Sequence, residues 1–157
     1  MPLSTEQETT IAAAIRAATA PAVVAALAIR NDPTITAWLN EASNQDAWIT
    51  NAAGNALFEN TNITKFDNLT AGKRDAWRLM LDFAPIDFAR VKFRNVVADV
   101  WGPADSVAVL QACTRKATRA ENFLGGVIEP TNTVAALDLS WAGTLGVNEV
   151  SRALNLH

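Results

Sequence analysis

The stretch from residue 70 to residue 101, TAGKRDAWRLMLDFAPIDFARVKFRNVVADVW, decides the fold class, because apolar side chains recur in it at helical spacing. Thr70 is suited to cap a first helix, and Pro85 is suited to end it. Trp77 and Met80 lie one turn apart on the same face of that helix. The pattern predicts an α-helix that buries an aromatic side chain.

Two further helices are expected directly after it. Asp87 is suited to cap the second helix, and Gly102 followed by Pro103 breaks it, as a glycine cap and a helix-stopping proline do. The third helix is expected over residues 104–124 and is closed by Gly125. Residues 70–124 are therefore predicted to form a three-helix core.

The flanking segments complete a mainly α fold. We expect short alanine-rich helices over 1–42, an irregular loop rich in asparagine and aromatic residues over 43–69, and a β-hairpin with a short final helix over 133–157. The hairpin is predicted from alternation up to Trp141 and a return strand at 144–145. The whole chain, 1–157, is expected to be a single domain.

The composition limits the chemistry that the chain offers. The single cysteine is Cys113 and the single histidine is His157, so a Cys/His nucleophile pair, a zinc cage of such ligands and a disulfide framework all lack their residues. Two of the three residues Asp82, Asp87 and Asp99 could in principle form a carboxylate pair for acid–base catalysis, although Asp87 is better explained as a helix cap. We expect a protein without catalytic activity, metal or cofactor.

The basic residues are concentrated in one segment. Nine of the thirteen lysines and arginines lie between Lys73 and Arg119, which gives that segment a net charge of +4, although the whole chain carries −3. This layout suggests a face that docks on an acidic surface or on an identical subunit, unless the charges only line solvated helix faces. No basic stripe with interleaved aromatic residues occurs, so no sequence-specific nucleic-acid partner is expected. No apolar run is long enough to span a bilayer, so no membrane partner is expected either.

A few large or charged side chains are candidates for packing or for contact with a partner. They are Trp48, Trp77, Trp101, Arg115, Arg119 and Trp141. Arg115 and Arg119 are four residues apart in a segment expected to be helical, so they are predicted to share a face. Two roles stay open for them, pairing with carboxylates across an interface or clamping the Trp101 turn within the chain.

Four stretches of the chain carry a family resemblance: FDNLTAGKRDAWRLML from residue 66, RNVVADVWG from residue 94, CTRKATRAENFLGG from residue 113 and SWAGTLGVNEVSRALNL from residue 140. With these stretches the chain resembles a family of small proteins that tailed phages and prophages encode among their virion morphogenesis genes. Gly146 departs from the pattern, since relatives often carry a serine cap there. The resemblance covers most of the chain, but its motifs encode no chemistry.

The resemblance implies a virion structural protein, made in the cytoplasm of the host bacterium and incorporated into the particle. Within that class, a small helical subunit looks like the head-to-tail connector or adaptor that forms an oligomeric ring in the neck. Its partners would then be further copies of itself and other phage structural proteins, such as portal or tail proteins. A capsid decoration protein, a tail-associated structural protein and an assembly factor absent from the particle are the alternatives.

Overall fold

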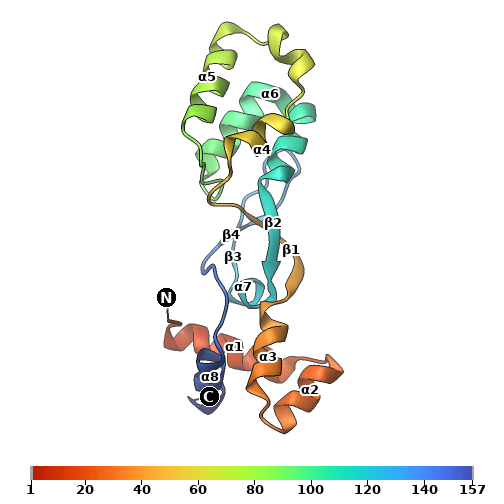
Figure 1. Ribbon diagram of the computed structural model, residues 1–157, viewed down its shortest axis with the longest axis vertical. Coiled ribbons are helices and arrows are strands. Elements are labelled where there is room, and N and C mark those ends of the chain that lie inside the picture. The colour runs from red at the N-terminus through yellow and green to blue at the C-terminus, as the bar shows by residue number, and fades with distance from the viewer. Residues whose placement is uncertain (1, 157) are drawn as a thin grey trace. The chain divides into compact units, whose positions relative to one another are not determined.

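The computed structural model describes residues 2–156, which form two compact units (Figure 1). Unit 1 contains the described residues up to Asn44, Lys116–Gly126 and the residues from Leu139 onward, and unit 2 contains Gln45–Arg115 and Val127–Asp138. The chain therefore passes between the units four times. Each unit has its own hydrophobic core, and the single domain expected from the sequence stays a prediction.

Unit 1 is built from five helices. They are α1 (Thr5–Ala17), α2 (Pro21–Ala28), α3 (Asp32–Asn40), α7 (Arg119–Leu124) and α8 (Val147–Leu156). Helix α8 packs against α1 and α3. The core between them contains aliphatic side chains from distant parts of the sequence, among them Ile11, Ile15, Ile35, Leu39, Val150 and Leu154. Burial of these side chains, each contributing about 1.5–3 kcal/mol, is the main stabilisation of the unit.

Local sequence signals set the helix starts in unit 1. The Ser4 side chain accepts a hydrogen bond from the Gln7 N–H, and the Gln7 side chain accepts one from the Ser4 N–H, so the two residues form a capping box. Pro21 is the first residue of α2, where a missing N–H costs nothing. Helix α3 is capped by Asn31 rather than by Asp32, because the Asn31 side chain accepts from the Thr34 N–H.

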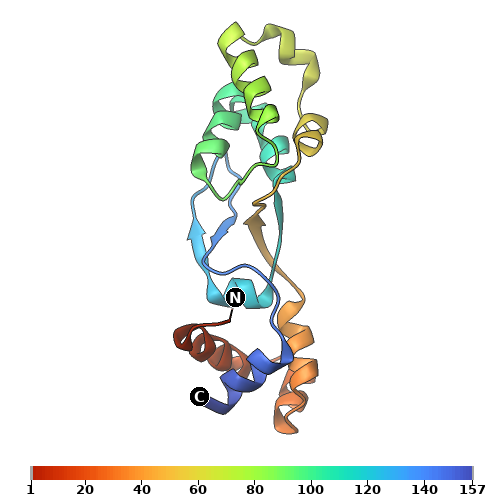
Figure 2. The ribbon, with the colours of Figure 1, turned by 60° about the vertical axis from the view of Figure 1, so that its left-hand side comes forward.

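Unit 2 is built around two long helices. Its helices are α4 (Gly54–Glu59), the 3-10 helix η1 (Ile63–Asn68), α5 (Ala71–Asp82) and α6 (Val91–Ala112). Figure 2 shows α5 beside the first part of α6. Thr70 caps α5 as expected, and Gly102, with φ 75° and ψ 175°, breaks the helical geometry inside α6 where the sequence predicts a break. The core of this unit contains large side chains, among them Leu57, Trp77, Ile86, Phe88, Trp101 and Leu110.

The prediction of an irregular loop over residues 43–69 is wrong. This stretch holds a strand, β1 (Ala42–Trp48), followed by α4 and η1. The strand is polar over most of its length, and only Ala47 and Trp48 in it are buried. Its residues do not alternate between apolar and polar, because the extended conformation comes from pairing with distant segments and not from a local pattern.

The sheet replaces the expected hairpin. Four strands, β1, β2 (Thr114–Thr118), β3 (Gly126–Ile128) and β4 (Leu137–Leu139), lie in the order β2-β1-β4-β3. Strand β4 pairs with β1 in parallel, with Ala47 opposite Leu137. Residues 144–145 form no return strand, because the backbone of Leu145 bonds to the Asn40 side chain instead.

The third helix expected over 104–124 is also interrupted. The helix ends at Ala112, residues 114–118 form β2, and α7 starts anew at Arg119. Thr118 caps α7 and Glu121 completes a second capping box. Arg115 and Arg119 therefore do not share a helix face, since one lies in a strand and the other begins a helix.

Candidate interaction surface

The tryptophans singled out from the sequence are packing residues within the units. The exposed fraction is 2% for Trp48, 1% for Trp77, 6% for Trp101 and 8% for Trp141. Trp77 and Trp101 meet edge to face, with ring centroids 5.4 Å apart and an interplanar angle of 88°, the arrangement that aromatic quadrupoles favour. These four side chains organise the two cores and leave little surface for a partner.

Arg119 acts as a clamp inside unit 1. Its guanidinium donates to the Trp38 carbonyl at 3.0 Å and pairs with the Glu41 carboxylate. It also stacks over the Trp38 ring, 5.2 Å from the ring centroid. The structure thus gives Arg119 an intrachain role at Trp38, whereas Arg115 is exposed on β2.

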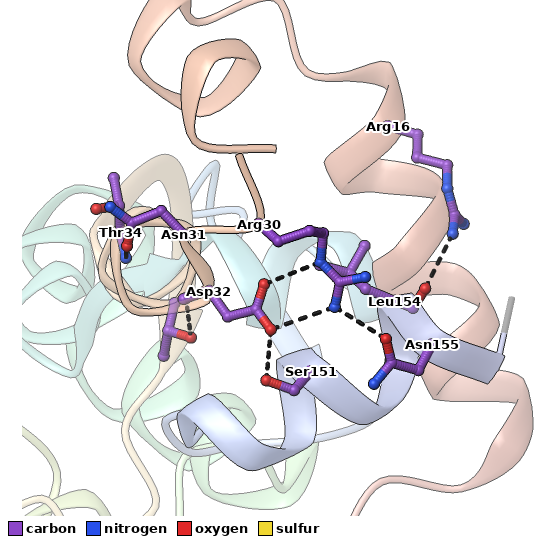
Figure 3. Close-up of polar contacts among 9 residues, drawn as sticks. Arg16, Arg30, Asn31, Asp32, Thr34, Ser151, Leu154 and Asn155 are labelled. Carbon is purple, nitrogen blue, oxygen red and sulfur yellow. Dashed lines mark hydrogen bonds and ion pairs between the residues drawn. The ribbon is translucent and has the colours of Figure 1, made fainter. Parts of the chain in front are cut away.

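A second polar cluster in unit 1 joins α3 to α8 (Figure 3). The Arg30 guanidinium donates to both Asp32 carboxylate oxygens at 3.3 Å and to the Asn155 side chain at 3.0 Å. The Ser151 hydroxyl donates to the same Asp32 carboxylate at 2.5 Å. These hydrogen bonds, from Arg30 first and then from Ser151, hold the pKa of Asp32 below its ordinary range. The cluster therefore stabilises the contact between the two helices.

One concave surface of unit 2 is a groove between α5 and α6. Its volume is about 600 Å³. Its lining comes from α5, from the connection over residues 83–90 and from α6, and the lining residues are Ala76, Leu79, Met80, Phe83, Pro85, Ile86, Asp87, Arg90, Lys92, Phe93 and Val96. We call this surface the α5–α6 groove.

Large apolar side chains stand open to solvent at this groove. Leu79 on α5 is 57% exposed, and Phe83, the residue that caps the end of α5 one turn later, is 65% exposed. Trp77 and Met80 occupy the buried face of the same helix, so α5 is apolar on two sides. Large apolar side chains left exposed at a concave surface are one of the features that mark interaction sites.

The charge at the groove is set by three side chains. The Asp87 carboxylate accepts from the Ala89 N–H at 3.0 Å and from the Arg90 guanidinium at 3.3 Å, so it forms a local turn and not the helix cap expected from the sequence. Lys92 makes no hydrogen bond or ion pair with any residue that the structure describes. The groove therefore offers a cation that is free to meet an acidic group.

A buried arginine shapes the end of the groove. Arg94 is 1% exposed, and its guanidinium donates to the carbonyls of Phe88 and Ala89, both at 2.8 Å. Glu129 pairs with it at 3.3 Å. Burial lowers the pKa of Arg94, and the neighbouring acidic charges oppose that shift. Arg94 fixes the turn that carries Asp87 and thereby the rim of the groove.

The other candidate groups are separate from one another. Asp82 is exposed at the end of α5, whereas Asp99 lines a smaller groove with Lys73. Cys113 is buried, and burial raises the pKa of its thiol to about 12. Among residues 2–156 no group of three His, Cys, Asp or Glu side chains is placed to hold a metal ion, and His157 lies outside that range.

Folding redistributes the charge of the basic segment. Unit 1 has six acidic and five basic residues, for a net charge of −1, and unit 2 has ten acidic and eight basic residues, for −2. Several cations of the segment between Lys73 and Arg119 pair with carboxylates of their own unit. The net charge of +4 in the sequence therefore does not become a positively charged unit.

No protein family, curated protein or solved structure matches this chain. No helix within residues 2–156 is by itself long and apolar enough to cross a membrane; only α1 and α2 taken together pass that test, and they are bent by 111°.

Proposed function

We propose that this protein is a structural subunit of a tailed-phage virion that assembles with copies of itself as a head-to-tail connector in the neck. The observation that carries the proposal is the α5–α6 groove, where Leu79 and Phe83 are exposed and Lys92 has no partner among residues 2–156. A subunit that acts by assembly needs such a surface, because burying apolar side chains between copies is the main source of interface stability.

The resemblance in sequence supports the same class. The stretches that carry it include α5, the first part of α6 and α8. Arg119 and the four tryptophans contribute to this function by holding each unit rigid, since a preorganised surface loses less entropy on assembly. The mechanism is mechanical, with many weak contacts adding up around a closed ring.

Quantitative mass spectrometry of purified particles tests the proposal. We expect the protein in the particle at the copy number of a single ring, and imaging of labelled particles should place it at the neck. Deleting its gene should leave filled heads and free tails that do not join.

Other results would assign other functions. A copy number that matches the capsid shell would indicate a decoration protein, and a location along the tail would indicate a tail-associated protein. Absence from purified particles, with assembly still dependent on the gene, would indicate an assembly factor. Each of these outcomes contradicts the connector.

A further inference from the structure

The α5–α6 groove lacks a partner within unit 2, and another part of the same unit has matching chemistry. That part is the turn over residues 58–63, at the end of α4, which we call the 58–63 turn. Phe58 is 51% exposed and Ile63 is 50% exposed. Neither residue lines the groove. Two different apolar surfaces are therefore present on one chain.

Glu59 gives the 58–63 turn its charge. This residue is exposed and makes no hydrogen bond or ion pair with the described residues. Two other acidic residues near exposed apolar side chains are already engaged, whereas Asp82, beside the groove residue Phe83, also makes no hydrogen bond or ion pair with the described residues. Glu129, next to Ile128, pairs with Arg94, and Glu149 accepts from the Gly146 N–H. Glu59 thus combines a free carboxylate with an adjacent aromatic side chain.

The 58–63 turn is held in shape before any partner binds. The Thr61 N–H and hydroxyl both donate to the Phe58 carbonyl, at 3.1 and 2.7 Å. The Asn60 side chain donates to the Ala56 carbonyl at 2.8 Å, and the Ile63 N–H donates to the Thr61 carbonyl at 3.0 Å. A segment fixed in this way loses little conformational entropy on docking.

We propose that the α5–α6 groove of one copy receives the 58–63 turn of a second copy, with Phe58 in the groove and Glu59 paired with Lys92. The two surfaces are complementary, because an apolar groove with a free cation meets an apolar turn with a free carboxylate. The contact joins two different surfaces, so repeated copies close into a ring when the rotation between them allows it. This inference deepens the proposed function and rests on it for the ring.

Charge exchange at the two positions tests the contact. In the full-length protein, Lys92→Glu would place two carboxylates opposite each other at the contact, and Glu59→Lys would place two ammonium groups opposite each other there. Each change should raise the dissociation constant for self-association at least about tenfold in sedimentation velocity. The double variant Glu59→Lys/Lys92→Glu restores opposite charges and should recover self-association.

Mixing the two single variants gives a second readout. The unchanged Glu59 of the Lys92→Glu variant meets the unchanged Lys92 of the Glu59→Lys variant, and the two introduced side chains also have opposite charges where they meet. The mixture should therefore associate although neither variant does so alone. Phe58→Ala should weaken association in all backgrounds. Lys73→Glu, which reverses an exposed cation outside the α5–α6 groove, is the matched control and should leave association unchanged.

The contact is overturned if the wild-type protein stays monomeric, if the single variants associate like the wild type, or if the double variant and the mixture fail to recover. Failure of the proposed function looks different. If self-association responds to the charge exchange as expected but the protein is absent from purified particles, the connector function is refuted and the contact is supported. If purified particles contain the Lys92→Glu protein at the normal copy number, the connector function is supported and the contact is refuted.

Discussion

The Arg94 guanidinium lies over the Trp48 ring, 4.8 Å from the ring centroid. This contact joins the end of β1 to α6 in the interior of unit 2, where both side chains are almost fully buried. A cation–π contact between a desolvated cation and an indole ring is more stabilising than the same contact at the surface. Since the same guanidinium holds the Phe88 and Ala89 carbonyls, Arg94 combines stacking and hydrogen bonding at one point.

Replacing Arg94 by methionine should lower the free energy of unfolding by about 2–4 kcal/mol, because a buried and a partly buried carbonyl lose their donor. Urea unfolding followed by tryptophan fluorescence measures the change. Lys73→Met is the control, since Lys73 is exposed, and its effect should stay within about 0.5 kcal/mol. Equal stabilities for the two variants would show that Arg94 is not needed for the turn.

Glu121 should be the most sensitive carboxylate of unit 1. It is 1% exposed, and its two oxygens accept from the Thr118 and Gly143 N–H groups at 2.8 and 3.0 Å. In Glu121→Gln an amide N–H faces one of these donors, so we expect a loss of about 1–3 kcal/mol in chemical denaturation. The exposed Glu41, changed in the same way, should cost under about 1 kcal/mol. A larger loss at Glu41 would refute this ranking.

Cys113 should be unreactive until the protein unfolds. Only the thiolate attacks a disulfide reagent, and burial both raises the thiol pKa to about 12 and blocks access. At pH 8 an aromatic disulfide reagent should label the native protein only as fast as it opens, and label the protein in urea at once. Rapid labelling without denaturant would mean that the core around Cys113 opens readily.

The Asp32 cluster predicts a loss of stability in acid. The pKa of Asp32 is lower in the folded than in the unfolded state, so its contribution is complete above about pH 4 and falls as pH drops through the folded pKa. Between pH 6 and pH 3 the wild type should therefore lose more unfolding free energy than Asp32→Asn. Ser151→Ala should fall between the two. Parallel pH profiles for the wild type and Asp32→Asn would contradict the cluster.

Two glycines provide a matched pair for the backbone. Gly102 has φ 75° and ψ 175°, a region that other residues enter only under strain, and a Cβ there would meet no atom within 4 Å. Gly102→Ala should therefore lower the melting temperature through backbone strain alone, equivalent to about 1–3 kcal/mol. Gly72 lies in α5 with equally open space, and Gly72→Ala should raise stability by up to about 1 kcal/mol. Changes of the same sign would refute this account.

Helix boundaries are the part of the fold that local chemistry predicts. The Thr70 cap and the break at Gly102 depend on neighbouring residues alone, and both predictions are confirmed. The Ser4 capping box and the first turn at Pro21 have the same local origin. The spacing of Thr118 and Glu121 is a capping box as well, and it is a signal that predicts a new helix at α7. Local chemistry thus also had the means to separate α7 from the helix before it.

The sheet and the candidate site are harder to predict, because both depend on distant residues. Strand β1 is polar, and its pairing of Ala47 with Leu137 joins residues ninety positions apart. Leu79 and Phe83 have the spacing of a buried stripe, yet the packing of α5 leaves them in solvent. Arg94 has the character of a surface residue and is buried. No neighbouring residue marks these outcomes.

The pairing of α1 with α8 has a consequence for synthesis on the ribosome. The apolar face of α1 emerges early, yet its partner side chains on α8 follow about 130 residues later. At roughly 5–20 residues per second, this face stays uncovered for on the order of ten seconds. Chaperones that shield nascent chains should therefore bind around Ile11 and Ile15, and should leave when α8 is translated.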